Sequence, residues 1–201
     1  MTRGLIFAAV LACGIAATAQ GQSTGLEIAL KHGSAREAAT KAQLQRLLRS
    51  YDVSQWLFTK SILVDEQAIP HSHPTLTLSA RHVHDDELLL STFVHEELHW
   101  FVADSKQSAE AIKELRRLFP SVPAQGPEGA NGEESTYLHL IVCFLEYDAD
   151  KELLGELKAR QLMDFWATDH YTWVYRTVLE RPREIGGVVR TYKLSPPAVR
   201  Q

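Results

Sequence analysis

The sequence predicts an α+β protein, in which a small sheet in the N-terminal half is followed by a mainly helical C-terminal half. Residues 56–80 contain segments that are rich in β-branched and aromatic residues or that alternate in polarity, as strands do. After residue 84, apolar residues recur at helical spacing in one long segment after another. Strands and helices that are grouped in this way along a chain are typical of the α+β class.

The first 19 residues have the features of a secretory signal peptide. Arg3 precedes the apolar run GLIFAAVLACGIAA, and Ala17 and Ala19 supply the small residues of a cleavage site. The run is shorter than the ~20 apolar residues of a membrane-spanning helix. We therefore expect a secreted or periplasmic protein with no stable membrane insertion after cleavage. A lipoprotein anchor at Cys13 is the alternative, because VLAC is a loose lipobox.

The rest of the chain predicts one domain at 34–201, preceded by a flexible arm at 20–33 that is small and polar. Cys143 is the one cysteine outside the leader, so we expect no intrachain disulfide and a core that relies on apolar burial. Its surroundings, LHLIVCFLE, predict a buried packing residue. The net charge of −4 argues against nucleic acid as a partner.

The elements of the N-terminal half follow from capping and periodicity. Residues 34–49 begin with a serine cap and predict a helix. Residues 56–67, WLFTKSILVDEQ, predict a strand or a hairpin. In residues 75–80, TLTLSA, threonine and leucine alternate, which predicts a half-exposed strand.

The second half is predicted to be helical apart from one loop. The segment 120–134 carries three prolines and three glycines, and it is long enough to be a lid or a variable insertion. The segment 162–180 is aromatic-rich, with a possible break at Thr168–Asp169. The other helices are predicted at 85–104, 108–119 and 135–154, with a short element after Pro182.

The motif His-Glu-x-x-His, at His95, Glu96 and His99, lies inside the apolar helix predicted at 85–104. Residues four apart lie one above the other on a helix face, about 6 Å apart along the axis, so both imidazoles can reach one ion. Zinc accepts neutral imidazole readily. Glu96 would lie beside the ion, where it can take a proton from a bound water. Glu97 is expected to face solvent or to form a salt bridge.

With this motif and the strand predicted before it, the chain resembles the zincin superfamily of metallopeptidases over roughly residues 55–150. The resemblance is strict only at His95, Glu96 and His99. It implies a small twisted sheet whose edge strand packs on the HExxH helix and aligns extended peptide by backbone hydrogen bonds. It also implies zinc-dependent hydrolysis of a peptide or protein substrate.

The third zinc ligand has two candidates. Glu146 and Asp150, one turn apart in FLEYDAD, resemble the third-ligand helix of gluzincins, in which the glutamate binds zinc and the aspartate orients a ligand histidine. His139 would instead complete a set of three histidines. The two candidates lie about 10 Å apart along the helix, so both could hardly bind one ion. We favour Glu146 and keep His139 as the alternative.

Further polar residues are candidates for contacts with a substrate. His170 and Tyr171, with Tyr175, could donate hydrogen bonds to an oxyanion. Two histidine pairs flank the predicted strand and could touch substrate or bind a second metal ion. These pairs are His71 with His73, and His82 with His84.

Together these features predict an exported zinc metallopeptidase. Two alternatives belong to other classes: a zincin-fold binding protein without catalysis, and a periplasmic metal-handling protein that uses the nine histidines of the chain. One tightly held zinc ion per chain favours the hydrolase over the metal-handling protein, which would bind several ions weakly.

Overall fold

The computed structural model describes residues 25–197, so the leader predicted at 1–19 and Cys13 lie outside the described residues. Within this range the α+β class is confirmed, with seven α-helices and one three-stranded sheet. In chain order the elements are β1 (Glu27–Leu30), α1 (Ala35–Ser50), a 3-10 turn (Ser54–Trp56), β2 (Ser61–Val64), β3 (Leu76–Leu78), α2 (Asp86–Asp104), α3 (Ser108–Leu118), α4 (Glu133–Leu154), α5 (Glu156–Asp169), α6 (Thr172–Glu180) and α7 (Pro182–Thr191).

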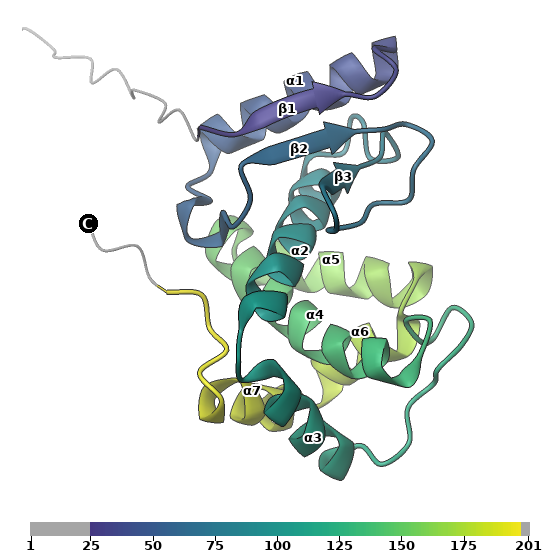
Figure 1. The fold of residues 1–201 in the computed structure, drawn as a ribbon, viewed down its shortest axis with the longest axis vertical. Helices are drawn as coiled ribbons and strands as arrows, with labels where there is room; N and C mark the ends of the chain where they lie inside the picture. Colours follow the sequence, from purple (N-terminus) through teal and green to yellow (C-terminus); the bar gives the residue numbers. More distant parts are fainter. Residues whose placement is uncertain (1–24, 198–201) are drawn as a thin grey trace, which may run out of the picture.

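The sheet is parallel, in the order β1-β2-β3, and α1 packs against β1 and β2 (Figure 1). Ile28 pairs with Ile62, which in turn pairs with Leu76, and all three side chains are buried. Because parallel strands need a crossover connection, α1 links β1 to β2. One strand forms within residues 56–67, so the strand alternative is confirmed there and no hairpin is present.

The prediction of a flexible arm at 20–33 is wrong for residues 27–30, which form β1. The segment EIAL is too short to give a clear alternating pattern, and its order comes from pairing with β2, more than 30 positions later. Glu37 of α1 stabilises the turn after β1, because its carboxylate accepts the backbone N–H groups of His32 and Gly33 at 2.9 and 2.8 Å.

The prediction that residues 75–80 form a half-exposed strand is also wrong, since Leu76, Thr77 and Leu78 are all buried. The alternation of threonine and leucine suggested a polar face in water. Thr77 is instead covered, with its hydroxyl donating to the carbonyl of Thr75 at 3.0 Å and its backbone bridged to His71. A polar side chain can be buried in this way once its hydrogen bonds are made within the protein.

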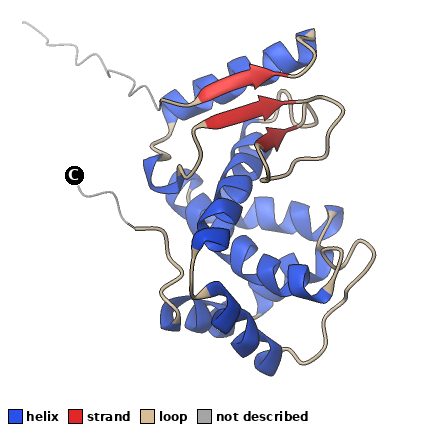
Figure 2. Cartoon of the chain, viewed as in Figure 1, coloured by secondary structure: helices blue, strands red, loops and turns tan. Residues whose placement is uncertain are grey.

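Most helices follow the predicted segments (Figure 2), but α5 begins at Glu156, before the predicted start at 162. The hydroxyl of Ser34 caps α1 at the N–H of Glu37, and the Asp85 carboxylate caps α2 at the N–H of Leu88. The predicted segment 162–180 is divided into α5 and α6 two residues after the expected break, where Tyr171 has a φ of 46°.

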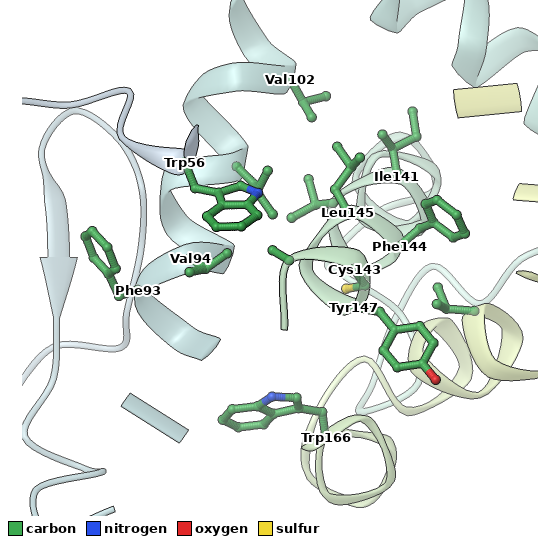
Figure 3. Close-up of a cluster of buried hydrophobic side chains, with 14 of the residues drawn as sticks. Trp56, Phe93, Val94, Val102, Ile141, Cys143, Phe144, Leu145, Tyr147 and Trp166 are labelled. Atoms are coloured by element: carbon green, nitrogen blue, oxygen red, sulfur yellow. The ribbon is translucent and has the colours of Figure 1, made fainter. Parts of the chain in front are cut away.

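The helix α2 joins the two halves of the molecule, because it packs on α1 and β3 as well as on α4 and α5 (Figure 1). Figure 3 shows Val94 and Val102 of α2 facing the same interior as Ile141 and Leu145 of α4. All four side chains are nearly inaccessible to solvent. Burial of each such side chain contributes about 1.5–3 kcal/mol, so this contact holds the two helices in fixed register.

The burial of Cys143, predicted from its apolar neighbours, is confirmed, and its thiol is free. Among residues 25–197, no helix is both long enough and apolar enough to span a bilayer.

Candidate metal centre

Two of the three histidines that converge in the molecule lie one turn apart on α2. The Nε2 atoms of His95 and His99 are 3.2 Å apart. Two imidazole nitrogens that bind one tetrahedral zinc ion at ~2.0–2.1 Å lie roughly 3.4 Å apart. The helix that carries the pair is capped at its start and buried along most of its length, so the spacing is fixed by the backbone.

The third histidine is His139 of α4. One nitrogen each from His95, His99 and His139 lies within 4.8 Å of the other two. The ring centroids of His139 and His99 are 4.8 Å apart, and those of His139 and His95 are 5.7 Å apart. The contact between α2 and α4 therefore brings together three imidazoles that are up to 44 positions apart in the sequence.

The outer nitrogens of two of these imidazoles are tied to the protein. His95 Nδ1–H donates to Glu146 Oε2 at 2.8 Å. His139 Nδ1–H donates to the carbonyl oxygen of Ser135, one turn earlier on α4, at 2.7 Å. Each hydrogen bond leaves the lone pair on Nε2, the nitrogen that faces the other rings.

The carboxylate of Glu146 is fully occupied by protein donors. In addition to His95, Tyr175 donates its hydroxyl to Oε2 at 3.0 Å, and Ser91 donates to Oε1 at 2.7 Å. The indole of Trp166 in turn donates to the Ser91 hydroxyl at 3.0 Å. Glu146 thus contacts the side of His95 opposite to His99, together with Cys143, with which it forms a separate buried group of potential ligands.

Asp150 does not make the contact to a ligand histidine that the sequence suggested, because Glu146 makes it. Asp150 is fully buried, and neither of its carboxylate oxygens has a hydrogen-bond partner among the described residues. Burial and the nearby charge of Glu146 raise the pKa of Asp150 well above its usual value. We therefore expect Asp150 to be a neutral acid.

Glu96, the middle residue of the motif, faces the open space beside the three imidazoles. Burial raises the pKa of Glu96 to about 7, although the charges of His95 and His71 oppose that shift. A carboxyl group with a pKa near neutrality can both accept and release a proton at the pH of most compartments.

Glu97 neither faces solvent nor forms a salt bridge, so that prediction is wrong. It is fully buried and accepts hydrogen bonds from the backbone N–H of Phe58, at 2.8 Å, and from both the N–H and the hydroxyl of Thr59. These bonds anchor the segment after the 3-10 turn to α2. The sequence carried no local signal of this contact, because its partners lie 38 and 39 positions away.

Of the three histidines, His99 and His139 are held in the neutral form. Burial, followed by the charge of His95, lowers the pKa of His99 to about 2 and that of His139 to about 3. Burial alone would also lower the pKa of His95, but its contact with Glu146 raises that pKa well above the usual value. Neutral imidazole is the form that binds a metal ion.

A cavity of about 500 Å³ opens onto the three imidazoles and Glu96. Its walls come from residues on the loop before β3, the loop after β3, α2, α4 and the junction of α5 and α6. They include Ile69, Pro70, His71, Ser72, Arg81, His82, Thr92, Trp166, Asp169, His170 and Tyr171.

His170 and Tyr171, predicted as oxyanion donors, both line this cavity. The left-handed backbone of Tyr171 is uncommon for a bulky residue, and such conformations concentrate at functional sites. It places the Tyr171 ring with its centroid 4.3 Å from that of His139. His170 Nδ1 donates to Asp169 at 2.8 Å. The hydroxyl of Tyr175 already donates its hydrogen bond to Glu146, so it is not available to an oxyanion.

The two histidine pairs around β3 have separate environments. His71 and His82 line the cavity, whereas His73 stacks on Trp100 with ring centroids 4.1 Å apart. Across residues 25–197, the groups of three or more side chains that could hold a metal ion include none of the four. One such group, His32, Glu37 and Asp65, lies elsewhere, and its Glu37 is already bonded to backbone amides.

The loop at 120–134 does not form the lid that the sequence suggested as one alternative. None of its residues lines the cavity. The carbonyl of Pro127 accepts the N–H of Thr172, and the hydroxyl of Thr136 donates to the carbonyl of Pro123, both at 2.9 Å. These bonds fix the loop against the starts of α4 and α6.

Sequence reasoning missed three contributors to this site: Ser91, Trp166 and Ser135. Ser91 was the one with a signal in the sequence, since a hydroxyl one turn before His95 in the run LLLSTF needs a polar partner when buried.

Comparison with protein-family models, curated proteins and solved structures finds no significant match to this chain.

Proposed function

We propose that the protein is a zinc-dependent hydrolase in which His95, His99 and His139 bind the metal ion and Glu96 is the general base. The observation that carries this proposal is the convergence of three imidazole nitrogens within 4.8 Å at the wall of a cavity. A set of three imidazole nitrogens with an open side matches catalytic zinc better than structural zinc, which is enclosed by four protein ligands.

His139 fits the role of third ligand better than Glu146. Its outer nitrogen is already hydrogen-bonded to a backbone carbonyl, as metal-binding imidazoles commonly are. Both oxygens of Glu146 already accept hydrogen bonds from protein groups, and Oε2 contacts Nδ1 of His95 and not the Nε2 that faces His99. We therefore replace the sequence-based preference for Glu146 with the three-histidine ligand set. Glu146 takes the orienting role first expected of Asp150.

A zinc ion held by the three histidines would supply a Lewis acid that polarises a carbonyl group and acidifies water. Glu96 is placed to accept a proton from the attacking water and to deliver it to the leaving group. Its position on the cavity wall, one residue after His95, suits both transfers. Glu146 holds the imidazole of His95 in the tautomer that presents Nε2.

Tyr171 and His170 are proposed to stabilise the negative charge that develops on the carbonyl oxygen. Both side chains line the cavity, the Tyr171 ring lies against His139, and either side chain can donate a hydrogen bond. Asp169 fixes the His170 ring through its Nδ1, which leaves Nε2 to meet a substrate.

The resemblance to zincins supports hydrolysis of a peptide or another amide. The arrangement of β3 at the sheet edge and packed on α2 supports the resemblance at the level of the fold. Export through the leader at 1–19 remains part of the proposal, and cleavage of the leader can be tested by N-terminal sequencing of the protein recovered from a periplasmic fraction.

The metal centre can be tested with matched variants. We expect one zinc ion per chain by mass spectrometry of the metal content, and loss of that ion in His139→Ala. Glu96→Gln should retain zinc and fold but lose hydrolysis of a broad peptide library. Retention of zinc by His139→Ala with its loss in Glu146→Ala would instead favour the gluzincin-like ligand set.

A further inference from the structure

The outer edge of β3 is already occupied by another part of the same chain. We call residues 69–74 the strap. The N–H of Thr77 donates to the carbonyl of His71 at 2.8 Å, and the N–H of His71 donates to the carbonyl of Thr77 at 3.1 Å. These are the backbone groups of the middle residue of β3 that do not pair with β2. The position where a further strand would add is thus filled.

The strap is also fixed to the helix of the metal centre. The indole N–H of Trp100 donates to the carbonyl of Ser72 at 2.9 Å, and the ring of His73 stacks on the same indole. Trp100 directly follows His99 on α2. The contacts therefore hold the strap beside the three histidines, independently of its pairing with β3.

The strap is at the same time a wall of the cavity, through Ile69, Pro70, His71 and Ser72. Elsewhere the cavity wall is closed by a bidentate ion pair between Arg81 and Asp169, which joins the loop after β3 to the end of α5. The cavity volume of about 500 Å³ lies within the range of roughly 300–1,000 Å³ that is typical of sites for small ligands.

We propose that the site accepts a compact acyl compound, an amide or ester of about the size of a dipeptide, rather than the interior of an extended polypeptide aligned along β3. Strand addition needs unpaired N–H and C=O groups at the edge of a sheet, and the strap pairs with both groups of Thr77. This inference rests on the proposed zinc hydrolase and specifies its substrate class.

The inference can be tested with hydroxamates, which bind zinc through a small head group. The zinc content of the protein is measured first, and the affinities of N-acetyl-alanine hydroxamate and N-acetyl-tetraalanine hydroxamate are then compared by calorimetry. We expect the two dissociation constants to agree within about threefold, because the extra residues find no free strand edge. Tighter binding of the longer probe by about tenfold or more would overturn the inference.

Two variants of the strap sharpen this test. His71→Pro removes the N–H that bonds to Thr77, whereas His71→Ala keeps that N–H and removes the imidazole. We expect the longer probe to gain about tenfold over the shorter one only where His71→Pro is combined with Trp100→Phe, which also removes the hydrogen bond to Ser72. A protein that holds no zinc would contradict the proposed function itself. Tight binding of the longer probe to wild-type protein with its full zinc content would contradict this inference alone.

Discussion

Glu96 and Glu97 are neighbours on α2, and both are buried, yet they face two different regions of the molecule. Glu97 faces the segment after the 3-10 turn, where Phe58 and Thr59 together supply three hydrogen bonds to its carboxylate. Glu96 faces the cavity, and no hydrogen bond from a described residue offsets the burial that raises its pKa. A saturated carboxylate stabilises the fold, while an unsaturated one remains available for chemistry.

Glu37 and Glu146 are also buried and saturated, but their hydrogen-bond donors differ. Glu37 accepts backbone N–H groups from the turn after β1, whereas Glu146 accepts a hydrogen bond from His95 of the proposed metal centre. The saturation of each group therefore predicts how its removal acts: on stability for Glu37 and Glu97, on metal affinity for Glu146, and on turnover for Glu96.

The largest expected effect is on turnover in Glu96→Gln. Loss of a general base lowers the rate by about 10²–10⁴-fold, and the neutral amide keeps the size of the side chain. Zinc content and Tm should stay at the wild-type values, because no hydrogen bond of the fold is lost. A fall in Tm of the kind expected for Glu97 variants would mean that Glu96 also has a structural role.

Glu97→Ala should have the opposite profile. It leaves the two N–H groups and the hydroxyl of residues 58 and 59 without a partner, at a cost of about 1–3 kcal/mol for each group that stays buried. We expect the free energy of unfolding to fall by about 2–4 kcal/mol, as measured by urea denaturation. Glu97→Gln, which keeps one acceptor, is the matched control and should lose less.

Glu146→Gln lies between these two cases. The amide can still accept one hydrogen bond, but it no longer places a negative charge next to the N–H at His95 Nδ1. We expect zinc affinity to fall by about 10–100-fold in competition with a chelator, with a smaller change in Tm. Trp166→Phe, which removes the donor to Ser91, is a milder control at the far end of the same chain of hydrogen bonds.

The smallest effect is expected from a partly exposed ion pair. Contact with Arg81 lowers the pKa of Asp169 to about 2, below the value of about 3.9 in an unfolded chain. The pair thus stabilises the folded state above pH ~4, and the contribution is lost as the pH falls toward 2. Because the Arg81 side chain is 53% exposed, we expect Arg81→Met to cost about 1 kcal/mol at pH 7. The difference from wild type should disappear near pH 2; a constant difference would point to lost packing.

The parts of the fold that were predicted are those with local signals. Ser34 and Asp85 mark helix starts by capping, and the segments of α1 to α4 repeat apolar residues at helical spacing. The four-residue strand β1 was missed because it is ordered by pairing with a distant strand. The burial of β3 was missed because β3 pairs with the strap. The strap in turn is held by Trp100, which lies well after β3 in the sequence.

The candidate site divides in the same way. The spacing of His95 and His99 within one helix was enough to predict that they converge, and the structure places them so. The relation of His139 and Glu146 to that pair depends on the rotation of α4 against α2, which no spacing within α4 defines. Sequence reasoning could therefore name both residues, but it could not decide which of them joins His95 and His99 and which contacts the outer nitrogen of His95.

X-ray absorption at the zinc edge of the zinc-loaded protein tests the central claim most directly. We predict a first shell of three imidazoles and one further light atom, with zinc–nitrogen distances of about 2.0–2.1 Å. A shell with a sulfur at about 2.3 Å, as Cys143 would give, or with two imidazoles and a carboxylate, would contradict the three-histidine centre.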